Sequence, residues 1–190
     1  HPYSLLVELA QEATYDIWSK RLVKAREVMQ ELSDLEDRLR QKYPDEIFTD
    51  LNEVQIYYYD TVQEPEKRDQ AFRTYIDALG RYDGSFIDYS ENINWICDTM
   101  FNSGKLYFVG DLLELTRDSV MDSGIPFMQL QFLERDVKYH KRIGDDEQVH
   151  LLESKYFQLS CIKNREDLRI YRTNISIHND LNSLKEEKDR

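Results

Sequence analysis

The chain has 190 residues, of which 41% are hydrophobic and 33% charged, and this composition fits a folded protein with a substantial core. Its formal net charge of −12 repels phosphate groups, so we do not expect nucleic acid or anionic membrane surfaces as direct partners. No apolar run approaches the roughly 18 residues that a transmembrane helix needs, so we expect no membrane contact by this segment.

Turn-forming residues recur about every forty residues along the chain. With few glycines and prolines elsewhere, two interleaved series of such residues indicate a unit of helix, short turn, helix and longer turn. The first series is Pro44, Gly84 and Gly124, with the turn-tolerant Asn164 at the next step, and the second is Pro65, Gly104 and Gly144.

Apolar residues follow helical spacing between these turns, which predicts four helix pairs. Pro65 suits the first turn of a helix, and Asp145 and Asp146 suit a helix start. In chain order we expect a first pair that turns near Ser19 and Lys20 and ends at Tyr43, a second with helices 45–63 and 65–79, a third with helices 85–103 and 105–122, and a fourth that begins after Pro126 and breaks at Gly144.

The segment 69–79 reads D-Q-A-F-R-T-Y-I-D-A-L and resembles the second helix of a tetratricopeptide repeat, whose pattern is A-x3-F-x2-A. Ala25, Val109 and Val149 take the place of Ala71 in the other pairs. The resemblance implies an all-α, right-handed superhelical stack of about four antiparallel helix pairs over residues 1–165. The forty-residue period and the missing W-x2-L-G-x2-Y signature depart from that family, so another α-solenoid type remains an alternative.

The last segment, 166–190, differs in character from the repeats. Apolar and small polar residues alternate there at intervals of four and three, which is typical of a coiled-coil seam and predicts dimerisation. Its final stretch, N-D-L-N-S-L-K-E-E-K-D-R, resembles the helix that connects a sensor to the output domain of bacterial diguanylate cyclases and histidine kinases. The alternative is a helix that caps the solenoid. The seam residues are Ile170, Asn174, Ile177, Leu181 and Leu184.

Catalytic signatures such as G-x-G-x-x-G, H-E-x-x-H and G-x-S-x-G are missing from the sequence, so we expect no enzyme, no cofactor and no metal. His140 and His150 flank the Gly144 turn, but two surface histidines explain them better than a metal site. The isolated Cys97 and Cys161 favour a reducing compartment, and hence the cytoplasm.

Candidate partner-binding residues are non-core positions on the first helix of each pair, because that helix lines the concave side of such solenoids. Of three successive tyrosines, at least one should face a groove or solvent. The candidates are Tyr58 in the second pair, Asn94, Asp98 and Asn102 in the third, where they form a polar stripe, and Lys138, Lys141 and Arg142 in the fourth, where they form a basic spot.

These features favour a regulatory module that binds a peptide or protein and couples to a C-terminal output domain such as a diguanylate cyclase. The alternatives are a stand-alone interaction scaffold and the peptide-binding part of a transcription regulator.

Overall fold

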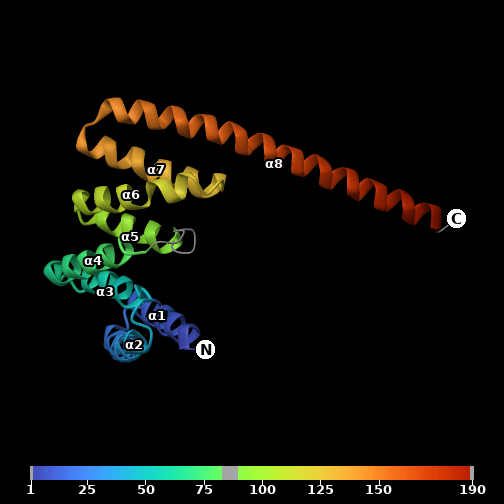
Figure 1. The fold of residues 1–190 in the computed structure, drawn as a ribbon. Helices are drawn as coiled ribbons and strands as arrows, with labels where there is room; N and C mark the ends of the chain where they lie inside the picture. Colours follow the sequence, from blue (N-terminus) through green and yellow to red (C-terminus); the bar gives the residue numbers. More distant parts are fainter. Residues whose placement is uncertain (1, 83–89, 189–190) are drawn as a thin grey trace. The chain divides into compact units, whose positions relative to one another are not determined.

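The computed structural model describes the backbone of residues 2–82 and 90–188, and the side chains of residues 3–82, 92–170 and 173. The described residues form helices joined by short connections and contain no strand (Figure 1). The helices are α1 (Pro2–Trp18), α2 (Leu22–Lys42), α3 (Asp50–Thr61), α4 (Pro65–Leu79), α5 (Ser90–Asn102), α6 (Leu106–Met121), α7 (Pro126–Ile143) and α8 (Asp146–Lys188).

Two compact units make up the chain, residues 1–119 and 120–190. The first unit contains α1 to α5 and most of α6, and the second contains the end of α6 with α7 and α8. The boundary expected between residues 165 and 166 lies inside α8, which continues through it as one helix.

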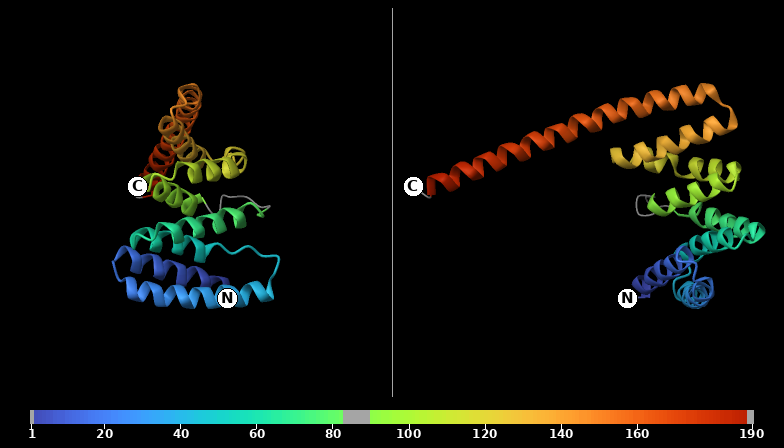
Figure 2. Two further views of the ribbon diagram at one scale, coloured as in Figure 1. Left: turned by 90° about the vertical axis from the view of Figure 1, so that its left-hand side faces the viewer. Right: turned by 180° about the vertical axis from the view of Figure 1, so that it is seen from behind.

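Successive helices pair in an antiparallel manner within each unit, α1 with α2 and α3 with α4 in the first, and α7 with α8 in the second (Figure 2). In the first unit α1 also contacts α3, and α3 contacts α5, so the first helices of the pairs lie against one another. These contacts confirm an all-helical stack of helix pairs. The right-handed sense expected for the stack stays a prediction.

The turns at Lys20, Pro65 and Gly144 fall where the sequence predicts them. Lys20 adopts a positive φ of 59° between α1 and α2, and Pro65 opens α4. Gly144 ends α7 with a left-handed φ of 79°, a conformation that costs glycine little. The Asp145 carboxylate then accepts a hydrogen bond from the Gln148 backbone N–H at 3.2 Å, as expected of a residue that caps a helix.

One expected turn is wrong, and another falls on residues that the structure does not describe. The turn expected near Asn164 is wrong, because Asn164 lies within α8 and no glycine or proline interrupts the helix there. Gly84 and its neighbours lie outside the described residues.

The start of α3 also differs from the prediction, which placed it at Asp45, whereas the helix begins at Asp50. Phe48 is only 3% exposed and its carbonyl accepts a hydrogen bond from the Arg40 guanidinium at 2.9 Å. The buried Glu36 carboxylate accepts one from the Leu51 N–H at 3.3 Å. Glu36 and Arg40 pair on α2, so a polar contact with α2 holds the connection non-helical and fixes where α3 starts.

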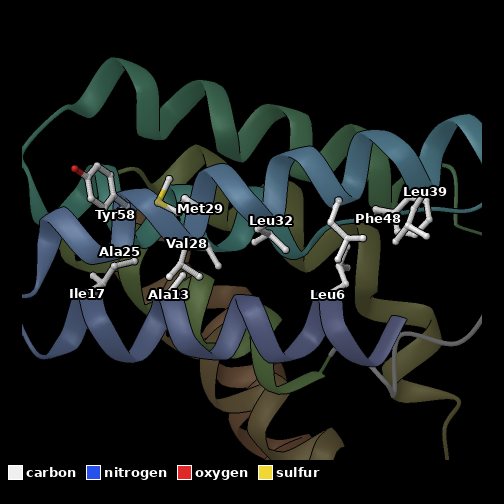
Figure 3. Close-up of a cluster of buried hydrophobic side chains, with 12 residues drawn as sticks. Leu6, Ala13, Ile17, Ala25, Val28, Met29, Leu32, Leu39, Phe48 and Tyr58 are labelled. Carbon is white, nitrogen blue, oxygen red and sulfur yellow. The ribbon is translucent and has the colours of Figure 1, made fainter. Parts of the chain in front are cut away.

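Close approach of α1 and α2 produces the best-defined part of the core (Figure 3). Ala13 and Ala25 are fully buried there beside Ile17, so a small residue on each helix allows the backbones to approach. The four positions aligned on Ala71 are all buried, as a shared packing role requires. They are Ala25, Ala71, Val109 and Val149.

Helix α8 is much longer than its partner. It has 43 residues against 18 in α7, or about 65 Å against about 27 Å, so its C-terminal part extends past α7 (Figure 1). Ile170 is described and is 58% exposed. The other seam positions, Asn174, Ile177, Leu181 and Leu184, lie in α8, but their side chains are outside those described.

Phe72 tests the packing between pairs, because its fully buried ring lies 4.3 Å from that of Phe108. We expect Phe72→Ala to lower the free energy of unfolding of the first unit by about 3–5 kcal/mol, through lost burial and a residual cavity. Urea unfolding followed by circular dichroism measures this. The control is Phe157→Ala at a ring that is 69% exposed, with an expected loss below about 0.5 kcal/mol. Equal losses in the two variants would contradict the packing described.

Candidate functional site: a pocket on the face of α1, α3 and α5

A cavity of about 380 Å³ opens on the face of the first unit formed by α1, α3 and α5. It lies on the first helices of three pairs, the face expected to bind a partner. Its volume falls within the usual range for ligand sites. The lining residues are Val7, Ala10, Gln11, Thr14, Tyr15 and Trp18 from α1, Asp50, Glu53, Val54 and Tyr57 from α3, and Asn92 and Trp95 from α5.

Helical spacing explains why these residues meet. Asp50, Glu53 and Tyr57 follow one another at intervals of three and four, so they occupy one face of α3. Gln11, Thr14 and Trp18 do the same on α1. Contact of α3 with both neighbours then brings the three faces around a common space.

Two stacked indoles form the rim of the pocket. The Trp18 and Trp95 rings lie 5.2 Å apart at an interplanar angle of 29°, yet they remain 56% and 54% exposed. Tyr15 on the same rim is 58% exposed. Single exposed apolar residues are ordinary, but a cluster of large aromatic side chains around a cavity marks an interaction surface.

Two carboxyl groups lie among the buried lining residues. Glu53 is only 7% exposed, and burial, together with repulsion from Asp50, raises its pKa to about 8. Burial likewise raises the pKa of Asp50 to about 6, with a further contribution from Glu36. The Thr49 hydroxyl donates a hydrogen bond to Glu53 at 3.3 Å, which opposes the rise for Glu53 only in part. Near neutral pH the empty pocket therefore favours a protonated Glu53 beside an ionised Asp50.

Tyr57 completes the polar part of the pocket. Burial raises the pKa of its phenol, and the nearby Glu53, Cys97 and Asp98 raise it further. Tyr57 therefore stays neutral and presents a hydroxyl that both donates and accepts hydrogen bonds.

The interpretation of Tyr58 as a partner-facing residue is wrong. Tyr58 is 3% exposed and packs against the α1–α2 core. The Arg26 guanidinium of α2 donates hydrogen bonds to its hydroxyl at 2.9 and 3.1 Å. Because successive helical residues point about 100° apart, turning Tyr58 toward α2 turns Tyr57 toward the pocket.

The polar stripe of α5 lies beside the pocket. Asn94 and Asp98 are half-buried and Asn102 is exposed, and none of the three is a lining residue. Asp98 nevertheless acts on the Tyr57 phenol, so it lies close to the residues of the site. The α5 residues that do line the pocket are Asn92 and Trp95.

The basic spot belongs to the second unit. Lys138, Lys141 and Arg142 are exposed near the end of α7, and together with Glu134 and Val137 they line an open depression. The Lys141 ammonium pairs with Glu153 of α8 at 2.7 Å, so part of the positive charge is neutralised within the helix pair.

His140 lies in the last turn of α7 and contacts the connection to α8. Its Nδ1 lies 3.1 Å from the Asp145 carboxylate and its Nε2 lies 3.5 Å from the buried Asp136. The first contact joins the end of α7 to the turn that precedes α8, and the second lies within α7. In the described part of the chain, no three histidine, cysteine, aspartate or glutamate side chains are placed to hold a metal ion.

Sequence reasoning missed the residues that form the pocket. The acid-acid-aromatic series at Asp50, Glu53 and Tyr57 shares one helix face, and this regular spacing could have identified it. The two tryptophans could not be joined in the same way, because Trp18 and Trp95 are far apart in sequence and meet only through packing of the pairs.

Comparison with known proteins adds no assignment: no protein-family model, no curated protein and no solved structure matches the chain. Within the described residues, none of the helices combines the length and apolar character needed to cross a lipid bilayer.

Burial of Glu53 predicts a pH-dependent stability. Its pKa is raised from an ordinary 4.5 to about 8, so the folded first unit holds a proton that the unfolded chain releases. Stability from this group is full below pH 4.5 and is lost as the pH rises to about 8, with a slope approaching about 1.4 kcal/mol per pH unit. Urea unfolding between pH 5 and 8 measures the slope through tryptophan fluorescence, because both tryptophans, Trp18 and Trp95, belong to the first unit.

The variant Glu53→Gln mimics the protonated side chain and should flatten this pH dependence between pH 7 and 8, above the raised pKa of about 6 of the remaining Asp50. Glu31→Gln makes the same chemical change at an exposed position of α2 and should leave the slope unaltered. Equal slopes for Glu53→Gln and the unchanged protein would show that Glu53 is not the buried titrating group.

Proposed function

We propose that this chain is a tetratricopeptide-like helical-repeat module that binds a peptide or protein segment on the face formed by α1, α3 and α5. The observation that carries the proposal is the pocket itself, whose lining combines stacked and half-exposed indoles with the buried Glu53 and the half-buried Asp50. Large aromatic anchors beside a few polar groups are the usual composition of a protein–protein hot spot.

A binding role suits the lining better than a catalytic one. The lining residues of the described chain include carboxyl, hydroxyl, amide and aromatic side chains but no cysteine, histidine or lysine. Such groups orient and desolvate a bound segment through hydrogen bonds and stacking. Cys97 lies buried in α5 and forms no disulfide, and cysteines in the reduced state suit the reducing cytoplasm in which we place the protein.

Coupling to a signalling output domain is the second part of the proposal. Helix α8 starts within a packed pair and continues for 43 residues, so a displacement of the pair is carried along a rigid rod. Leu168 and Ile170 are exposed on its extension, at 56% and 58%. A second α8 packed along the seam would bury Ile170, which supports a parallel dimer of the kind that connecting helices form in bacterial signalling proteins.

A random peptide library displayed on phage tests the binding function. We expect enrichment of peptides whose affinity falls at least about tenfold in Trp95→Ala, because truncating an aromatic anchor removes a hot spot. The control is Phe157→Ala, an exposed aromatic outside the pocket, which should bind the same peptides unchanged. Failure to enrich any peptide, or enrichment that is indifferent to Trp95→Ala, would contradict the proposed function.

Sedimentation analysis tests the role of α8. We expect the full chain to self-associate in a concentration-dependent manner and a chain that ends at Arg169 to remain monomeric, since it lacks the seam. Ile170→Glu in the full chain, which places a charge in the seam at an exposed position, should also weaken association. Association that survives both changes would show that the seam does not form the dimer.

A further inference from the structure

The charges lining the pocket are unbalanced. Asp50 and Glu53 contribute carboxyl groups, and the lining of the described chain has no lysine, arginine or histidine to compensate them. Arg21, directly before α2, already has a partner, because its guanidinium donates a hydrogen bond to the buried Asp16 at 2.7 Å. A ligand that brings a positive charge would supply the missing counterion.

The aromatic rim favours the same kind of ligand. Indole faces attract cations, and the planar, weakly hydrated guanidinium of arginine stacks on them. The rim already shows this contact within the chain, since the Arg21 guanidinium lies over the Tyr15 ring at 4.8 Å from its centre. Val7, Ala10 and Val54 line the remaining wall and suit the methylene stem of a long side chain.

We infer that the pocket accepts a basic side chain, preferably arginine, of the bound peptide, with its guanidinium between the Trp18–Trp95 rim and the carboxyl groups of Asp50 and Glu53. This inference rests on the proposed function and specifies what the peptide must contain. The cavity of about 380 Å³ has room for roughly a dozen waters at about 30 Å³ each, and so for one such side chain.

Binding of a cation should expel protons from the pocket. A guanidinium favours the ionised form of a neighbouring carboxyl group and lowers its pKa. Because Glu53 is largely protonated in the empty pocket at neutral pH, its proton leaves to solvent as the cation enters. Affinity for a basic peptide therefore rises as the pH increases from 5 to 8.

Among the described residues, the other groups near the two carboxyl groups are neutral or acidic, apart from Arg40, which is paired with Glu36 of α2. The remaining groups are Gln11 and Tyr15 of α1, Tyr57 of α3, Tyr75 of α4, and Asn92, Cys97 and Asp98 of α5.

A pair of peptides that differ only in charge tests the inference on the full chain. The probes are acetyl-Gly-Leu-Arg-Leu-Gly-amide and the same peptide with citrulline, which keeps the shape of arginine without its charge. Both tryptophans of the chain form the pocket rim, so intrinsic fluorescence reports occupancy of this site alone. At pH 8 we expect the arginine peptide to bind at least about tenfold more tightly than the citrulline peptide.

Two further measurements connect the preference to the carboxyl groups. Asp50→Asn, which keeps the shape of the side chain, should weaken the arginine peptide about tenfold and leave the citrulline peptide unchanged, whereas Glu31→Gln should alter neither. Calorimetry at pH 7 in two buffers of different ionisation enthalpy should show proton release with the arginine peptide and none with the citrulline peptide.

The outcomes separate this inference from the proposed function. Equal affinity for the two peptides, no saturable response to the arginine peptide, or tighter binding at pH 5 than at pH 8 would overturn the inference. If library peptides that depend on Trp95 are nevertheless selected, the proposed binding function is supported but the ligand is not a basic side chain. If no such peptide is selected, the proposed function and this inference are both wrong.

Discussion

Contacts from α2 hold α3 at both ends, and the arrangement of the first unit depends on them. At the N-terminal end the buried Glu36 carboxylate accepts the Leu51 N–H, and at the C-terminal end Arg26 donates to the Tyr58 hydroxyl. Together they fix where α3 begins and how it is rotated about its axis. Since α3 contacts both α1 and α5, its rotation decides which side chains face them, and hence which residues form the pocket.

The same rotation places Asp50 and Glu53 where their ionisation is penalised. Burying a carboxyl group is costly unless it is paired, and in the described part of the chain Glu53 has hydrogen-bond partners but no cationic one. Sites that depart from local stability rules are frequently functional ones, because the loss is recovered when a ligand binds. The exposed, stacked indoles that line the same pocket are also unfavourable without a partner, since they expose apolar surface that a partner would cover.

Helix α8 shows a second consequence of helix pairing. An amphipathic helix is stabilised by what its apolar face packs on, and α7 covers only the first part of α8. The forty-residue pattern predicted a turn near Asn164, where the pair should end. No breaking residue stands there, so the helix continues beyond its partner, and Ile170 on its extension is exposed.

The helical class, the turns at Lys20, Pro65 and Gly144 and the buried positions aligned on Ala71 followed from the sequence, because breakers and helical periodicity act over a few residues. Tyr58 shows the limit of such reasoning. Periodicity could not tell which of three successive tyrosines faces the core, because a contact with Arg26 of another helix sets the rotation. Trp18 and Trp95 show the same limit for the site, since residues far apart in sequence become neighbours only when α1, α3 and α5 pack. The sequence alone thus determined the helical class and several of the turns, and the tertiary structure decided where α3 begins and which helix faces meet, because both depend on contacts between helices.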